Sequence, residues 1–354
     1  MKYVTSEKMK NAIITMYKAR YDIEKTAERM GFKRIEIPTV FSIRYKKWQK
    51  PIQAYLYWKN SRIWDKTFKS MEDGSDVIIQ INLFNRCLNF YKIIEKHKNR
   101  LNFITLIHDL ESIRFIGDKT KSEGYMERTH RDEIGILIHS NKVISHNEAM
   151  TKELVRLGVD REKIINLEIF DYLNDEKKKA KAHYGGNIII AGNLAPDKAG
   201  YLNGLKNIKG VDFNLYGFNY TEEYNGKNIH YKGNFSPEEL VESLDGGFGL
   251  IWDGDSVETC SGFTGQYLKY NNPHKTSLYL SSGLPVIIWE KAALAHFIVD
   301  NKLGFSVKTI EEIPKKLKKI SEKDYKEMTK NVKIIAKKLK TGKFTEEALK
   351  KAEK

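Results

Sequence analysis

Residues 272–287 read NPHKTSLYLSSGLPVI, and this stretch decides the fold class. Pro273 suits the start of a helix and Gly283 suits its C-terminal cap. The helix then leads into the apolar run 285–289, which is typical of a strand buried on both faces of a parallel sheet. Lys275 falls in the first turn of this helix. The stretch therefore predicts one unit of an α/β protein.

The same alternation of helices and strands extends in both directions. In the second half we expect strands at 187–190, 213–216, 249–252 and 285–289, with helices between them. In the first half we expect strands at 34–37, 77–81, 103–107, 143–144 and 164–167, and helices at 23–30, 86–99 and 148–157, the last ended by Gly158. The chain is thus predicted to hold two successive parallel-sheet units.

The length of 354 residues also favours two domains. A charged stretch without periodicity, 174–181, is the expected linker. The predicted divisions are an N-terminal domain 1–182, a C-terminal domain 183–330 and a basic amphipathic helix 331–354. The apolar residues of the tail recur three and four positions apart, so they form one stripe of a helix: Tyr325, Met328, Val332, Ile335 and Leu339.

The composition is that of a globular protein, with 41% hydrophobic and 30% charged residues. No signal peptide is visible and no apolar run approaches the roughly 20 residues of a membrane span, so we expect a cytoplasmic protein, with the inner face of the cell membrane as an alternative place. Cys87 and Cys260 are far apart and lack metal-ligand spacing, which predicts packing roles. The net charge of +15 predicts an anionic partner: nucleic acid, a membrane surface or a phosphorylated small molecule.

A glycine turn opens the second half. Residues 188–194 read IIIAGNL, a strand that runs into Gly192, where backbone N–H groups can approach a phosphate. The G-x-G-x-x-G spacing of a dinucleotide site is missing. Alone, this segment is an ordinary turn between a strand and a helix. Lys275 at a helix N-terminus adds the positive charge that a diphosphate leaving group needs.

Several further motifs accompany these segments. They are GGFGLIWDGD at 246–255, NFSPEEL at 234–240, IHDLES at 107–112 and ISHNEAM at 144–150. Together with 191–194 and 273–287, they resemble the bacterial GT-B transferases called glucosyltransferase 3-like and β-1,6-galactofuranosyltransferases. The resemblance covers most of residues 186–305 and is fainter in the first half.

This resemblance implies two Rossmann-like domains that face each other across a cleft, with a C-terminal helix that crosses back to the N-terminal domain. It implies transfer of a hexosyl unit, galactofuranose first and glucose second, from a UDP-sugar to a saccharide acceptor during synthesis of cell-surface polysaccharide or glycoprotein glycans. The acceptor is expected to be linked to a lipid diphosphate or to protein, and no cofactor is expected besides the UDP-sugar donor. The contrasting hypothesis is a non-catalytic basic protein that binds nucleic acid or anionic membrane.

The resemblance also assigns donor-binding residues. Lys275 would contact the diphosphate, Gly192 and Asn193 would line the glycine turn, and Lys198 is a candidate second cation. An aromatic side chain at 216–218 or Phe235 would stack on the base, with a core role for Phe235 as the alternative. The expected set is Gly192, Asn193, Leu194, Lys198, Tyr216, Gly217, Phe235, Trp252, Asp253, Lys275, Thr276 and Ser277.

The catalytic residues are less directly indicated. Many retaining GT-B enzymes have a glutamate five residues before the Gly-x-Pro element, and here that position is Leu278. An inverting mechanism with a general base is therefore expected. Asp109, at a predicted strand end, is the first candidate, followed by Glu111 and His108. The alternative role for Asp109 is an N-cap.

No metal site is expected. Asp253-Gly254-Asp255 has the form of a metal-binding Asp-x-Asp, but acidic residues around a glycine are common in turns, and Lys275 already supplies positive charge. The glycine-rich stretch 260–265 is predicted to be a mobile loop over the sugar.

Aromatic and basic residues alternate between positions 44 and 64. The stretch begins with Arg44, Tyr45, Lys46, Lys47 and Trp48 and continues through Tyr55, Tyr57, Trp58, Lys59, Arg62 and Trp64. Three partners fit this pattern: a peripheral membrane or acceptor surface, another subunit in a homo-oligomer, or single-stranded nucleic acid. Because no nucleic-acid motif accompanies the stretch, we do not expect nucleic-acid binding.

Overall fold

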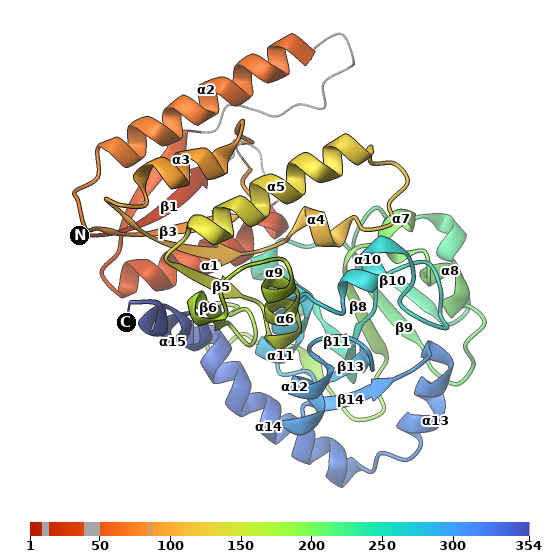
Figure 1. Ribbon diagram of the computed structural model, residues 1–354. Helices are drawn as coiled ribbons and strands as arrows, with labels where there is room; N and C mark the ends of the chain where they lie inside the picture. Colours follow the sequence, from red (N-terminus) through yellow and green to blue (C-terminus); the bar gives the residue numbers. More distant parts are fainter. Residues whose placement is uncertain (9–13, 39–49, 85, 354) are drawn as a thin grey trace. The chain divides into compact units, whose positions relative to one another are not determined.

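The computed structural model describes residues 1–8, 14–38, 50–84 and 86–353 and divides into two compact units (Figure 1). The first unit comprises residues 1–113, 119–167 and 345–354, and the second comprises 114–118 and 168–344. Each unit is built around its own six-stranded parallel sheet. The predicted α/β class with two Rossmann-like domains is confirmed.

The sheet of the first unit has the order β2-β1-β3-β4-β5-β6. Its strands are β1 (Lys2–Lys8), β2 (Lys33–Pro38), β3 (Asp76–Ile81), β4 (Asn102–Ile107), β5 (Lys142–Ser145) and β6 (Ile164–Asn166). Its helices are α1 (Ile14–Arg29), α2 (Lys50–Lys69), α3 (Phe90–His97), α4 (Glu111–Arg114), α5 (Glu123–His139) and α6 (Glu148–Arg156), and a 3-10 turn spans Arg161–Lys163. Helix α3 packs against both α2 and α5 on one face of the sheet (Figure 1).

The order of strands explains where a ligand would bind in this unit. The chain runs from β1 outward to β2 and then returns to β3 on the other side of β1. In open parallel sheets, ligands bind at the carboxyl ends of the strands beside such a reversal. The strands beside the reversal are β1 and β3, and β4 is the next strand after β3.

The sheet of the second unit has the order β10-β9-β8-β12-β13-β14. Its strands are β8 (Ile188–Asn193), β9 (Phe213–Phe218), β10 (Ile229–Gly233), β12 (Phe248–Ile251), β13 (Val286–Trp289) and β14 (Gly304–Val307), beside a small ribbon of β7 (Lys181–Ala182) and β11 (Asp245–Gly246). Its helices are α7 (Pro196–Ala199), α8 (Leu202–Leu205), α9 (Pro237–Ser243), α10 (Gly262–Tyr267), α11 (His274–Ser281), α12 (Ala295–Asp300), α13 (Ile313–Leu317) and α14 (Glu322–Thr341), with 3-10 turns at Glu222–Tyr224 and Ile310–Glu312. The strands added after β8 extend the sheet to one side and those from β12 onward extend it to the other, so the strand order reverses between β8 and β12.

The expected strands that were apolar throughout are all present, because an apolar run identifies a strand buried on both faces. Strand β1 was not predicted because its sequence is KYVTSEK. The side chains of Thr5, Ser6 and Glu7 are nevertheless buried, and they have partners inside the unit: the Ser6 hydroxyl donates to Glu24 Oε2 at 2.9 Å. A buried polar network of this kind leaves no trace in hydrophobic periodicity.

Two local predictions were wrong. Residues 260–265 are not a loop throughout, because helix α10 begins at Gly262 and Cys260 is fully buried beneath it. The tail 331–354 is not one helix, because Gly342, with a φ of 83°, ends α14 before α15 (Lys343–Ala352) begins. The predicted stripe on α14 does pack inward. Residues 345–354 group with the first unit, where Lys2 Nζ lies 2.9 Å from Glu353 Oε1.

Three further observations concern the predicted surface features. Among the described residues, no helix has both the length and the apolar character needed to cross a membrane. Residues 44–48 of the aromatic-basic stretch lie outside the described residues. On α2, Trp64 is a core residue whose ring lies 5.0 Å from that of Phe90, whereas Tyr55 and Trp58 are exposed and stack on each other.

Candidate functional site

The candidate donor site lies in the second unit, where β8 and β12 end side by side in the middle of the sheet. Gly192 and Asn193 are the last residues of β8, and Trp252 and Asp253 follow β12. This is the point at which the strand order reverses, and it is where open α/β sheets bind their ligands.

Two glycines bring the ends of β8 and β9 together. Gly192 and Gly217 are paired in the sheet and have φ values of 132° and 146°. A Cβ atom added to Gly217 would lie 1.8 Å from the carbonyl oxygen of Gly192, so no larger residue fits there. A Cβ added to Gly192 would meet nothing within 4 Å. The turn at Gly192 therefore borders open space, as a phosphate site requires.

Asn193 shapes the turn that follows. Its Oδ1 accepts hydrogen bonds from the backbone N of Ala195, at 3.0 Å, and from Asn219 Nδ2, at 2.9 Å. The short helix α7 begins directly after this turn and carries Lys198. The carbonyl oxygen of Lys198 accepts from the backbone N of Gly254 at 2.8 Å. The segment after β8 is thereby tied to the segment after β12.

Lys275 lies in the first turn of α11, as predicted, and its ammonium group reaches the end of β12. Nζ donates to the carbonyl oxygen of Trp252 and to Asp253 Oδ1, both at 2.7 Å. The lysine side chain is 16% exposed and the aspartate side chain 9%. The structure therefore brings together a glycine turn, a helix N-terminus and a largely buried cation. Asp253 forms an ion pair with the Lys275 ammonium group.

Several predicted donor residues have buried side chains that pack or form hydrogen bonds inside the second unit. Tyr216 is buried and its hydroxyl accepts from the backbone N of Asp245 at 3.1 Å. The Ser277 hydroxyl donates to the carbonyl oxygen of Phe170 at 2.6 Å. The side chains of Leu194, Trp252, Asp253 and Thr276 are buried as well. Phe235 is half-buried, with its ring 6.1 Å from that of Tyr216, which agrees with its expected packing alternative.

Tyr279 supports the site as well, and sequence analysis missed it. Its hydroxyl accepts a hydrogen bond from the backbone N of Ala191, one residue before Gly192, at 2.7 Å. Burial raises the pKa of this phenol well above its usual value, so the hydroxyl stays protonated. Its ring occupies the space that a side chain at Gly249 would fill. The signal in the sequence was a glycine inside an apolar strand, Gly249, because such a glycine often makes room for a large neighbouring side chain, here that of Tyr279.

The acidic residues after β12 have protein partners. Asp253 is paired with Lys275, and Asp255 accepts a hydrogen bond from the Ser261 hydroxyl. Across the described ranges of the chain, no three Asp, Glu, His or Cys side chains are arranged to hold a metal ion.

The candidate catalytic residues follow β4 in the first unit. The His108 ring is hydrogen-bonded through Nε2 to Gln80 Oε1 at 2.8 Å. Asp109 is partly buried and interacts electrostatically with Arg20. Burial lowers the pKa of Arg20, and the nearby carboxylates, including that of Asp109, partly oppose this shift. Glu111 accepts from Arg86 Nη2, at 2.9 Å, and from the hydroxyl of Tyr125.

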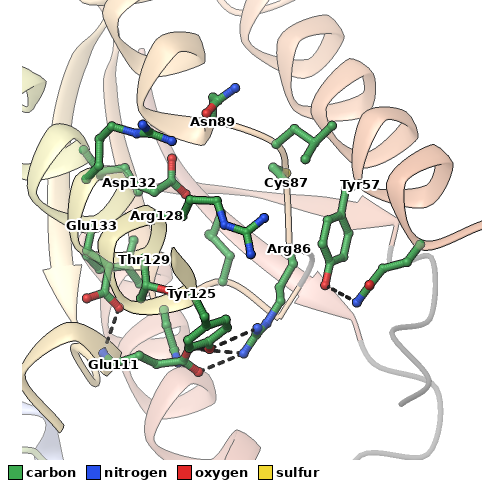
Figure 2. Close-up of a pocket in the computed structure, with 17 residues that line it drawn as sticks. Tyr57, Arg86, Cys87, Asn89, Glu111, Tyr125, Arg128, Thr129, Asp132 and Glu133 are labelled. Carbon is green, nitrogen blue, oxygen red and sulfur yellow. Dashed lines mark hydrogen bonds and ion pairs between the residues drawn. The ribbon is translucent and has the colours of Figure 1, made fainter. Parts of the chain in front are cut away.

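A cavity of about 330 Å³ lies beside Glu111 at the carboxyl end of β3 (Figure 2). Its walls come from α2, from the segment after β3 and from α5, and they include Glu111 but neither His108 nor Asp109. Figure 2 shows Arg86, Tyr125 and Glu111 meeting at one end of the cavity, with Arg128 extending toward them from α5. The sequence did not predict this cavity. The only local signal was that residues 125, 128, 129 and 132 are three and four positions apart, which places them on one face of a helix.

Comparisons with known proteins place both halves of the chain in one family. The C-terminal domain of glucosyltransferase 3-like proteins matches residues 188–352, and the N-terminal domain of the same family matches residues 1–169. β-1,6-Galactofuranosyltransferase WbbI of Escherichia coli (strain K12) is 40% identical over 291 residues, which cover 80% of this chain and 81% of that protein. Glucosyltransferase 3 of Streptococcus gordonii is 26% identical over 334 residues, which cover 94% and 92%. None of these relatives supports a nucleic-acid-binding function.

Solved structures agree with the fold. HepE of Anabaena, in complex with UDP and glucose, superposes with a TM-score of 0.60 at 11% identity and covers 99% of this chain and 98% of that one. A glycosyltransferase from Rickettsia africae gives a TM-score of 0.59 at 11% identity and covers 99% and 96%. The chain has the GT-B fold and belongs to the glucosyltransferase 3-like family of glycosyltransferases.

Proposed function

We propose that this protein transfers a hexosyl unit from a UDP-sugar to a saccharide acceptor and binds the diphosphate of the donor beside Gly192 and Lys275. The observation that carries the proposal is the position of Lys275, whose ammonium group is held within 2.7 Å of two oxygen atoms after β12. A helix N-terminus and a fixed cation at the carboxyl ends of the central strands would stabilise the negative charge that develops as the bond between sugar and diphosphate breaks.

Lys198 is the proposed second cation. Among the residues that the structure describes, its side chain has no ion pair, and its main chain is tied to the segment that carries Asp253. The lysines and the helix N-terminus would supply the positive charge at the leaving group. We therefore propose a reaction that needs no divalent metal, and activity in the presence of a chelator tests this point.

The proposed reaction inverts the configuration of the transferred sugar. Leu278, at the position of the glutamate in many retaining enzymes, is buried in the core of the second unit, so this position supplies no carboxylate. Asp109 is the proposed base, with Glu111 and His108 as alternatives. The base takes the proton of the acceptor hydroxyl while that oxygen attacks the anomeric carbon and the bond to the diphosphate breaks.

Galactofuranose is the first proposed sugar, because the relative with 40% identity is named a β-1,6-galactofuranosyltransferase, and glucose is the second. The acceptor is proposed to be a glycan of the cell surface, linked to a lipid diphosphate or to protein. Membrane contact or oligomer contact is proposed for the exposed face of α2, where the Tyr55 and Trp58 rings lie 6.0 Å apart and Arg62 lies over Trp58. A cytoplasmic location is part of this proposal.

Titration calorimetry with UDP tests the donor assignment. We expect UDP to bind the wild-type protein, and uridine to bind more weakly because it lacks the diphosphate. Absence of UDP binding to the wild-type protein would contradict the proposed function.

A further inference from the structure

The cavity in the first unit differs in chemistry from the donor site. It contains three arginines and three carboxylates, namely Arg86, Arg128, Arg131, Glu111, Asp132 and Glu133, together with the hydroxyl groups of Tyr57 and Tyr125. Formal charges in this set balance. What the cavity offers to a ligand therefore depends on which of these charges already have partners in the protein.

Two of the carboxylates are used to cap helices. Asp132 Oδ1 accepts from the backbone N of Tyr91 at 3.2 Å, at the start of α3. The two oxygens of Glu133 accept from the backbone N of Glu111, at 2.8 Å, and of Ser112, at 2.9 Å, at the start of α4. A carboxylate at a helix N-terminus satisfies N–H groups that have no partner within the helix. Neither side chain is available to a ligand without uncapping a helix.

The third carboxylate is paired inside the wall. Glu111 accepts from Arg86 Nη2 through both oxygens, at 2.9 and 3.2 Å, and from the Tyr125 hydroxyl. This pair uses one negative and one positive charge of the cavity. Figure 2 shows the three side chains converging.

The guanidinium groups of Arg128 and Arg131 are the two cationic groups of the cavity that are not paired with a carboxylate among the described residues. Arg128 Nε donates to the carbonyl oxygen of Gly124 at 2.9 Å, which leaves its terminal nitrogens free of any ion pair within the described part of the chain. Arg131 influences Asp132 electrostatically but does not form an ion pair with it. Both side chains are exposed. The hydrogen-bonding groups left for a ligand are therefore cationic, because the three carboxylates are used in capping and pairing, whereas the terminal nitrogens of the two arginines form no ion pair among the described residues.

We propose that this cavity binds an anionic group of the saccharide acceptor, a phosphate or a carboxylate, through Arg128 and Arg131. The proposal rests on the proposed transferase function. Guanidinium groups bind both anions through paired, charge-assisted hydrogen bonds that a neutral sugar cannot form. The position fits an acceptor, since the cavity opens at the carboxyl end of β3 and includes Glu111, one of the candidate bases.

Calorimetry with the donor site filled by UDP tests this proposal. The probes are inorganic pyrophosphate, glucuronic acid and glucose, each titrated into protein that is already saturated with UDP. We expect at least one anion to bind the wild type and glucose to bind more weakly than that anion. The double variant Arg128→Gln/Arg131→Gln should bind the anion at least about tenfold more weakly, because two charge-assisted contacts are lost. Stronger binding of pyrophosphate would indicate a phosphate-bearing acceptor, and stronger binding of glucuronic acid a uronic acid.

The control variant is Arg29→Gln, which removes an exposed arginine from the end of α1 that does not line the cavity. It should bind the anion as the wild type does. Anion affinity that survives in the double variant, glucose affinity equal to that of the anions, or no anion binding to the wild type would each overturn the proposal. UDP affinity is measured in the same samples. If UDP binds normally and the anions do not, only the cavity assignment fails; if UDP does not bind the wild type, the proposed function fails.

Discussion

Replacing Lys275 by methionine removes the cation of the donor site while keeping an unbranched side chain. The ammonium group makes charge-assisted contacts of 2.7 Å, and a diphosphate would replace or share them. A hydrogen bond to a charged group contributes about 1.5–3 kcal/mol. Loss of one such contact predicts UDP binding that is weaker by roughly 10- to 100-fold, since about 1.4 kcal/mol corresponds to a factor of ten. Asp253, left without its cation, would increase the loss by repelling the diphosphate.

Calorimetry with UDP and with uridine measures this effect. Uridine lacks the diphosphate, so its affinity should change little in Lys275→Met, and the ratio of the two affinities isolates the diphosphate contribution. Adding Asp253→Asn to Lys275→Met should restore part of the UDP affinity, because it removes the unpaired negative charge. Lys209→Met, at an exposed lysine of the same unit, is the matched control. If UDP and uridine affinities fall by the same factor in Lys275→Met, the assignment of Lys275 to the diphosphate is wrong.

Three further predictions concern support of the donor site, pH dependence and the catalytic base. Tyr279→Phe leaves the backbone N–H of Ala191 without its acceptor and should lower the free energy of unfolding by about 1–3 kcal/mol, measured by urea denaturation. His146 donates from Nε2 to the carbonyl oxygen of Ile107, and burial lowers its pKa from 6.5 to about 4. Between those values the unfolded state takes up a proton that the folded state does not. Stability should therefore fall as the pH drops from 6.5 to 4, by up to about 3 kcal/mol from this group, seen as a pH slope that flattens in His146→Gln. Asp109→Asn should reduce turnover by roughly 100-fold or more while UDP affinity is unchanged, in a transfer assay paired with calorimetry.

Each of these predictions has its own control. Tyr184→Phe removes a hydroxyl that donates to Ile320 at the surface, where water can replace it, so it should cost much less than Tyr279→Phe. Burial raises the pKa of Glu133 to about 7, which makes stability fall as the pH rises from 4.5 to 7 and opposes the effect of His146. The difference between wild type and His146→Gln cancels that contribution. An unchanged pH slope in His146→Gln, equal costs for both tyrosines, or full turnover in Asp109→Asn would contradict the respective prediction.

The sequence was sufficient to predict the strands that contain a continuous apolar run, as at 77–79 in β3 and 286–289 in β13. It was also sufficient to predict the helix that carries Lys275, because proline and glycine mark its two ends. Strand β1 was missed because three of its five buried side chains, those of Thr5, Ser6 and Glu7, are polar and have hydrogen-bond partners far away in the sequence. Hydrophobic periodicity reports burial only where burial is apolar.

The contacts within the candidate sites could not be predicted in the same way. Lys275 and Asp253 are 22 residues apart, and no local pattern links a helical lysine to a turn that precedes it by this distance. The cavity in the first unit combines side chains of α2, of the segment after β3 and of α5, which only the folded sheet brings together. Which arginines of the cavity lack an ion pair among the described residues depends on the partners of each carboxylate, and those partners come from other elements of the fold.

The most direct test of the proposed glycosyl transfer is an assay with purified protein, UDP-galactofuranose, UDP-glucose and a panel of saccharide acceptors, with the products analysed by mass spectrometry and NMR. We expect release of UDP together with a product that is one hexose larger, in inverted configuration, with a chelator present. Failure to transfer from either UDP-sugar by a protein that binds neither donor would contradict it.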